Sequence, residues 1–224
     1  MTTKPLNSDF YAGDALTAFK EGDYKGGIGL SDHRTGAMRL CEAVMMYLQL
    51  PIPHDGPILD IGAGYGSLFH MLVAMDAAPT KYVGVEPSPA LFDHMSQRCE
   101  HLLQGSNLFD TGTKMHLLEM DGATYFRTHP EADPQRTTFI LGVASTLSEE
   151  EFKELLASAM ATSAAVVVSF LDANIYRGAF NAYTPSQVMK WVQSSAHMVD
   201  ATPRINHPHE DSVNPMSWTI GFVT

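Results

Sequence analysis

The residues best placed to do chemistry are glycines and acids grouped around one turn. An apolar run, Ile58 to Ile61, ends at three alternate glycines, Gly62, Gly64 and Gly66. Apolar residues then recur at helical spacing, so we expect a strand, a tight turn and a helix. Glycine lets the backbone approach a ligand closely, and the N-terminus of the helix leaves unpaired N–H groups facing it. The stretch therefore predicts a nucleotide-binding turn.

Asp60 decides which nucleotide suits this turn. A dinucleotide would place its pyrophosphate here, and a carboxylate two residues before the first glycine would repel it. S-adenosylmethionine (SAM) has no phosphate and carries a sulfonium and an ammonium, which an acid attracts. The run from Lys81 to Glu86 predicts a second strand that ends in an acid twenty residues after Gly66. That spacing suits a carboxylate that holds ribose hydroxyls, so we expect Glu86 to bind the ribose.

The pattern Asp-x-Gly-x-Gly-x-Gly at residues 60–66 resembles motif I of the class I SAM-dependent methyltransferases. The resemblance covers about residues 55–172 by motif and the remainder by the order of elements. It implies an α/β fold, Rossmann-like and doubly wound, with a mostly parallel seven-stranded sheet, an antiparallel edge strand and an N-terminal helical lid. It also implies that Asp121 and the backbone beside it contact the adenine. The cofactor-binding residues expected on this basis are Asp60, Gly62, Ala63, Gly64, Glu86, Pro87, Asp121, Gly122 and Val143.

The other elements follow from apolar periodicity and from helix start and stop signals. Beyond the first two strands, strands are expected over 115–120, 137–147 with its exit loop, 164–171 and 216–223. Helices are expected over 37–50, 88–103 and 184–195, and one begins at Ser148. The two cysteines, Cys41 and Cys99, fall on two of these helices, and we expect both to be buried thiols.

The segment before the turn has aromatic residues beside charged ones, which predicts a short amphipathic helix. In the methyltransferases that the chain resembles, an N-terminal helical segment folds over the cofactor. By this resemblance residues 1–54 form a lid or appendage, in which Tyr11 and Tyr24 help to close the substrate pocket. Residues 55–224 then form the SAM-binding domain. The alternative is a helix that only packs against the core.

A catalytic base is needed only if the methyl acceptor must lose a proton, as a hydroxyl must. His33 and His207 are the candidates, and catalysis by positioning and desolvation alone is the alternative. Many small-molecule methyltransferases have two histidines after the fourth strand, where this chain has Ser145 and Thr146. This departure argues against a base there, and we expect Ser145 to contact the substrate. The stretch from His207 to His209 is interpreted as an exposed loop, so no metal is expected.

Composition bears on the partners and on the compartment. The chain has 224 residues and a formal net charge of −11 with only 14 Lys and Arg, whereas binding a nucleic acid requires basic residues. A small metabolite methylated on O or N is therefore the leading acceptor, and no nucleic acid is expected. We expect no membrane span and no secretion signal, hence a cytoplasmic protein, with a homodimer as the assembly to consider. A protein or peptide methyltransferase and a SAM-binding protein without methyl transfer remain alternatives, because fold analogy does not separate them.

Overall fold

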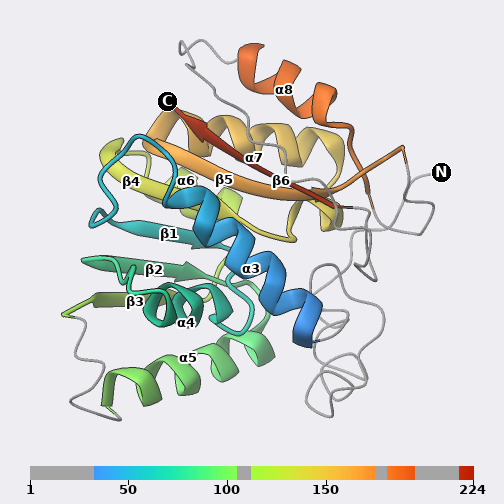
Figure 1. Cartoon of the computed structure of the whole chain (residues 1–224). Helices are drawn as coiled ribbons and strands as arrows, with labels where there is room; N and C mark the ends of the chain where they lie inside the picture. The colour runs from blue at the N-terminus through green and yellow to red at the C-terminus, as the bar shows by residue number, and fades with distance from the viewer. Residues whose placement is uncertain (1–32, 105–111, 175–180, 195–216) are drawn as a thin grey trace.

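A computed structural model describes residues 33–104, 112–174, 181–194 and 217–224 of the chain (Figure 1). Helices and strands alternate along almost all of this sequence, as expected for a parallel α/β sheet. In chain order the elements are α3 (His33–Tyr47), β1 (Ile58–Ile61), α4 (Ser67–Ala74), β2 (Lys81–Val85), α5 (Pro89–Gln104), β3 (Lys114–Leu118), α6 (Gly122–Thr128), β4 (Asp133–Ile140), the 3-10 turn η1 (Ala144–Thr146), α7 (Glu149–Thr162), β5 (Ser163–Leu171), α8 (Pro185–Ser194) and β6 (Ser217–Val223).

The strands form one sheet in the order β3-β2-β1-β4-β5-β6. Neighbouring strands are parallel except for β6, which runs antiparallel to β5 at the edge. The strand order reverses direction between β1 and β4, where Asp60 pairs with Phe139. Ligands of open α/β sheets bind at such a switch point, beyond the carboxyl ends of the strands. The glycine turn after β1 lies at this place.

The expectation of seven strands is wrong for the described residues, whose sheet has six. The seventh strand was implied only by the resemblance, because the sequence itself shows six strand patterns. The doubly wound, mostly parallel arrangement and the antiparallel edge strand are confirmed.

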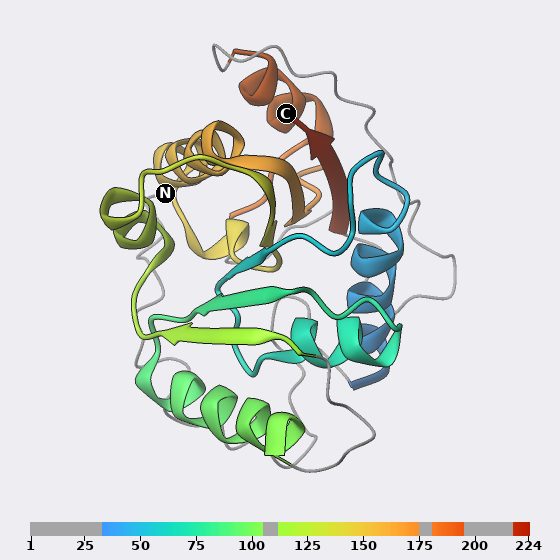
Figure 2. The same ribbon diagram turned by 90° about the vertical axis from the view of Figure 1, so that its left-hand side faces the viewer.

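Helices cover both faces of the sheet and enclose two apolar cores. Figure 2 shows α3 and α4 on one side of the sheet and α6 and α7 on the other. Side chains of β1 alternate between these cores: Ile58 packs on the side of α3 and α4, and Leu59 and Ile61 pack on the side of α7. Every residue of β1 is buried, as expected for a parallel strand covered on both faces.

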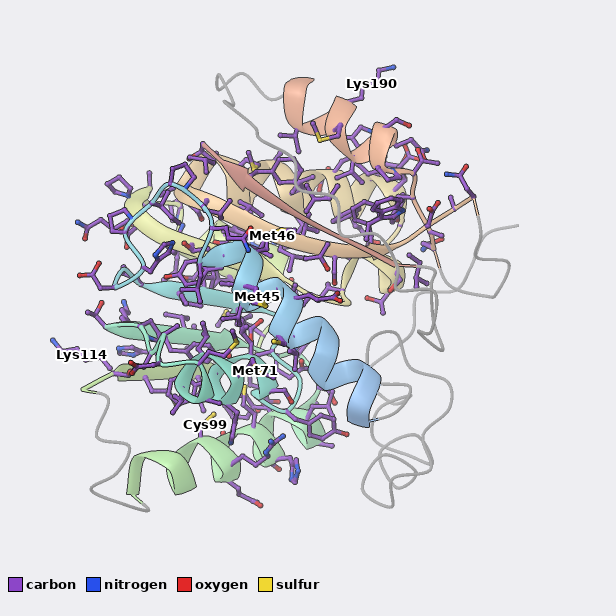
Figure 3. The ribbon with its side chains drawn as sticks, in the orientation of Figure 1. Met45, Met46, Met71, Cys99, Lys114 and Lys190 are labelled. Carbon is purple, nitrogen blue, oxygen red and sulfur yellow. The ribbon has the colours of Figure 1, made fainter. Side chains whose placement is uncertain are left out.

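Helix α3 is part of the core on its side of the sheet. Val44 and Tyr47 are fully buried, and the helix packs against α4 and β6. Met45 on its outer face is 48% exposed (Figure 3). Cys99 on α5 is buried as expected, whereas Cys41 on α3 is partly exposed, so the expectation of a buried thiol is wrong there. Among the described residues, no helix has the length and apolar character needed to cross a membrane.

Strand β3 and helix α6 differ from the expected pattern for local reasons. Strand β4 begins at Asp133, before the expected 137, and α3 covers His33–Tyr47 where 37–50 was expected. Strand β3 ends at Leu118, because the Met120 N–H donates to the Leu118 carbonyl in a turn and does not continue the ladder. Helix α6 had no predicted counterpart, although its start carries a signal. Asp121 occupies its N-cap, where the side chain accepts from the Thr124 N–H at 2.7 Å.

Ser148 at the start of α7 provides a test of how this helix is fixed. Its hydroxyl accepts from the Glu151 N–H, and the Glu151 side chain accepts from the Ser148 N–H, which completes a capping box. We predict that Ser148→Ala lowers the free energy of unfolding by about 1 kcal/mol in urea titration. Glu154→Ala, an exposed position of the same helix, is the control and should change stability by less than about 0.5 kcal/mol. Equal effects of the two changes would contradict the capping role.

Candidate functional site

The turn after β1 is held open by left-handed glycines. Gly62, Gly64 and Gly66 have φ angles of 70°, 56° and 70°, values that residues with a side chain rarely adopt. The N–H groups of Gly62 and Ala63 both donate to the Val85 carbonyl, at 2.8 and 3.0 Å. The turn is thus tied to the end of β2, and α4 begins directly after it. This geometry fits the nucleotide-binding turn that the sequence predicts.

Glu86, the residue after β2, ties the turn to the start of α5. One carboxylate oxygen accepts from the Gly64 N–H at 2.8 Å, and the other accepts from the Ser88 N–H at 2.9 Å. The side chain is only 5% exposed. Burial raises the pKa of Glu86, and the two N–H donors offset part of that rise. Since each carboxylate oxygen has a further lone pair, Glu86 can still accept hydrogen bonds from ligand hydroxyls.

Asp60 lies beneath the turn, bound to a tyrosine of the neighbouring strand. Its carboxylate accepts from the Tyr82 hydroxyl at 2.6 Å. Asp60 pairs with Gly84 across the two strands, and the Tyr82 ring passes over Gly84. A Cβ on Gly84 would lie 3.1 Å from the Tyr82 ring, so the missing side chain makes room for the contact. The sequence did not indicate this partner, because pairing register cannot be read from strand patterns.

The environment of Asp60 raises its pKa from 3.8 to about 7. Burial is the main cause, since the side chain is 3% exposed and loses the hydration of its charge. The nearby Glu86 charge raises the pKa further, whereas the Tyr82 hydrogen bond lowers it. A cation placed above the turn would stabilise the ionised form of Asp60 and lower its pKa again. The ionisation of Asp60 therefore depends on the charge of a bound ligand even where the two make no contact.

Val143, between β4 and η1, packs directly on the first glycine of the turn. A Cβ on Gly62 would lie 2.2 Å from Val143 Cγ2, far inside contact distance. Gly62 is therefore required both for its φ angle and for the space that Val143 occupies. The contact joins the loop after β4 to the turn after β1, on the two sides of the switch point.

The loop after β4 is held by hydrogen bonds within itself and to β5. The Gly142 N–H donates to the Ser169 hydroxyl at 2.9 Å. Ser145 is buried, and its hydroxyl donates to the Gly142 carbonyl at 3.0 Å. The Thr146 hydroxyl donates to the Val143 carbonyl at 2.8 Å. The Ser145 proton is thus used within the loop, whereas the hydroxyl oxygen can still accept a hydrogen bond, so its contact with the substrate stays a prediction.

The chain after β5 returns to support the same loop. The Asn181 N–H donates to the Ser145 carbonyl at 3.0 Å, and its side-chain amide donates to the Leu147 carbonyl at 2.6 Å. The Tyr183 hydroxyl donates to that carbonyl as well, at 3.0 Å. These contacts fix the loop after β4, on the side of the switch point formed by β4 and β5. Glu86, which follows β2, belongs to the other side.

Asp121 and Gly122 form the start of α6, after β3. Both Asp121 oxygens accept from Thr124, from its N–H at 2.7 Å and its hydroxyl at 2.9 Å. Partial burial favours a higher pKa, but these hydrogen bonds hold the pKa of Asp121 below its ordinary value. Gly122 packs closely on β1, since a Cβ there would lie 2.6 Å from Ile61. The exposed carboxylate of Asp121 is an N-cap in this structure.

The structure brings all nine expected cofactor residues to the side of the sheet where the parallel strands have their carboxyl ends. Asp60, Gly62, Ala63, Gly64, Glu86, Pro87, Asp121, Gly122 and Val143 all follow or end strands β1 to β4. His33 is the first residue of α3, and its side chain is not among those described. Tyr11, Tyr24 and His207 lie outside the described residues. In the part of the chain that the structure describes, no group of His, Cys, Asp and Glu could hold a metal ion.

The fold is similar to solved structures of methyltransferases. Magnesium protoporphyrin IX methyltransferase (ChlM) from Synechocystis PCC 6803, with bound SAM, aligns over 99% of each chain with a TM-score of 0.69 and 15% identity. A SAM-dependent methyltransferase from Leishmania major aligns with a TM-score of 0.61 and 12% identity, over 98% of this chain and 87% of that one. The small RNA methyltransferase HEN1 has a TM-score of 0.61 and 14% identity, over 83% of this chain and 25% of its own.

No protein-family model matches the sequence, and no curated protein matches it. The structural likeness and the strand order together show that the chain has the Rossmann-like fold of the class I SAM-dependent methyltransferases. At 12–15% identity the likeness establishes the fold, and the function must be argued from the site.

The contact between Gly62 and Val143 predicts unequal effects of alanine at two glycines of the turn. Gly62→Ala and Gly64→Ala share a left-handed strain of about 1–2 kcal/mol. Only Gly62→Ala adds the clash with Val143, because a Cβ on Gly64 meets nothing closer than the Gly62 carbonyl at 3.9 Å. Overpacking of this kind adds about 1–3 kcal/mol, measured as loss of unfolding free energy. Val143→Ala should recover part of that loss in the Gly62→Ala background and none in the Gly64→Ala background.

The raised pKa of Asp60 predicts a pH-dependent stability. Because the folded pKa, about 7, exceeds the ordinary value of 3.8, the folded chain keeps a proton that the unfolded chain releases, so stability falls as pH rises through that window. Asp60→Asn should flatten the fall and be the more stable protein at pH 8, by at most about 4 kcal/mol. Urea titrations between pH 4 and 8 measure this, with Asp93→Asn on the exposed side of α5 as the control. An unchanged profile in Asp60→Asn would mean that Asp60 stays ionised throughout.

Proposed function

We propose that the protein is a SAM-dependent methyltransferase that acts on an O or N atom of a small metabolite. The observation that carries the proposal is the pair of buried carboxylates around the glycine turn. Glu86 binds the Gly64 N–H, and Asp60 lies beneath the turn at 3% exposure. Asp60 opposes a pyrophosphate and favours cationic groups, and Glu86 suits ribose hydroxyls. SAM has both, and the fold is one in which ChlM was crystallised with SAM bound.

The chain's own groups suit each part of this cofactor. Glu86 accepts hydrogen bonds from the ribose, and the glycines of the turn let the backbone approach the nucleoside closely. Asp60 acts on the sulfonium and ammonium by its field from below the turn. Asp121, Gly122 and the exposed Pro87 line the adenine side. When bound, SAM supplies an activated methyl group, so the protein must mainly orient the acceptor and exclude water.

The acceptor side of the site is the loop after β4. Val143 places this loop against the turn, and Asn181 and Tyr183 hold it from the other side. The net charge of −11 supports a small molecule over a nucleic acid. For a hydroxyl acceptor, we assign the base to His33 or His207. The segment before α3 is the lid that brings Tyr11 and Tyr24 to the acceptor, since α3 itself packs in the core. The protein then works in the cytoplasm without a metal.

Ligand binding tests the donor site. We predict that SAM and its demethylated product bind in isothermal titration calorimetry and that NAD does not. Glu86→Gln keeps the shape of the side chain but loses its charge, and it should weaken SAM by about 1.5–3 kcal/mol. Glu100→Gln, an exposed position on α5, is the matched control and should leave the affinity unchanged. Tighter binding of NAD than of SAM would refute the proposal.

The transfer itself is tested with SAM labelled in its methyl group. The protein is incubated with labelled SAM and with small-molecule, protein and RNA fractions of a cell extract. Label in the small-molecule fraction supports the proposal. Label in the protein or RNA fraction would assign another acceptor class, and SAM binding without label in any fraction would indicate a binding protein.

A further inference from the structure

Ser88, two residues after Glu86, has a buried hydroxyl whose hydrogen bonds are missing. The side chain is 1% exposed, and among the described residues its Oγ is the one buried side-chain oxygen or nitrogen without a hydrogen-bond partner. Leaving such a group unpaired destabilises a folded protein. Buried polar groups are nearly always paired, so this hydroxyl is a candidate to bind a group of a ligand.

The position of Ser88 excludes the simplest structural role. Ser88 directly precedes α5 and its first residue, Pro89, where a serine normally caps the helix with its hydroxyl. Here the Phe92 N–H donates to the Ser88 carbonyl, and the hydroxyl makes no cap bond. A serine in the capping position that does not cap leaves its hydroxyl available for another purpose.

The neighbour of Ser88 indicates what that purpose is. The Ser88 N–H donates to one Glu86 oxygen while the Gly64 N–H donates to the other, so Ser88 and the glycine turn flank the same carboxylate. An ionised carboxylate can only accept hydrogen bonds, whereas each ribose hydroxyl also has an oxygen that needs a donor. The serine hydroxyl can donate as well as accept. It therefore complements Glu86 at a vicinal diol.

On the basis of the proposed function, we propose that the Ser88 hydroxyl binds a ribose hydroxyl of the nucleoside held by Glu86 and makes the site selective for ribose over deoxyribose. The orphan hydroxyl then gains its partner when the ligand binds, and its cost is confined to the ligand-free protein. Glu86 supplies the acceptor and Ser88 the donor of one recognition pair.

Calorimetry on the full chain tests the assignment, with S-adenosylhomocysteine and its 2′-deoxy and 3′-deoxy analogues as probes. Ser88→Ala should weaken S-adenosylhomocysteine by about 2–10-fold, the value of one neutral hydrogen bond. It should weaken one of the two deoxy analogues less, because that analogue already lacks the partner hydroxyl. Ser88→Cys, a close isostere with a weak donor, should shift affinity in the same direction and serves if the alanine variant fails to fold. Ser96→Ala on α5 is the control and should keep wild-type affinity.

The melting temperature of the ligand-free protein separates a binding role from a structural one. Removing an unpaired buried hydroxyl should leave it unchanged or raise it, whereas loss of a helix cap would lower it. A lowered melting temperature with unchanged ribose selectivity would overturn the assignment, as would unchanged affinity for all three probes. If wild-type protein binds none of the probes, the proposed function fails as well. If wild type binds them and Ser88→Ala binds them equally, the ribose assignment alone fails.

Discussion

The carboxylate of Glu86 is the interaction on which the geometry of the candidate site depends. It accepts from the Gly64 N–H on one side and the Ser88 N–H on the other. The glycine turn after β1 and the start of α5 are therefore positioned by one side chain at the end of β2. A charged acceptor with two N–H donors is stronger than a neutral pair, and its burial keeps water from competing. A ligand bound by Glu86 therefore meets a turn and a helix start that are already in position.

Asp60 is a second acid of the candidate site, and its burial makes ionisation costly. Asp60 is buried, and its carboxylate accepts from the Tyr82 hydroxyl, which fits because Gly84 has no side chain. With a pKa of about 7, Asp60 is partly protonated near neutral pH. A cationic ligand favours the ionised form, so its binding and the release of a proton from Asp60 are linked. An anionic ligand would find no such compensation, so Asp60 is the basis on which the proposed site distinguishes a sulfonium cofactor from a dinucleotide.

The proposed acceptor side is built from parts that are distant in sequence. Val143 fills the space that Gly62 leaves, and Ser169 of β5 accepts from the Gly142 N–H. Asn181, beyond β5, completes the support of the same loop. The loop after β4 is thus positioned against the turn by packing and by backbone hydrogen bonds. The Ser145 hydroxyl donates to the Gly142 carbonyl and so helps to fix the conformation of the loop.

The sequence by itself determined the local features: the glycine turn, the acids at Asp60 and Glu86, and six strand segments along the chain. These depend on backbone conformation, strand-end position and short-range periodicity, which a linear pattern contains. Only the tertiary structure decided which side chains meet across strands, such as Tyr82 with Asp60 and Val143 with Gly62. A strand pattern repeats every two residues and leaves the register with its neighbour unspecified, so these contacts could not be predicted. For the same reason the sequence identified Ser88 as the start of a helix, and only its burial revealed a hydroxyl without a partner.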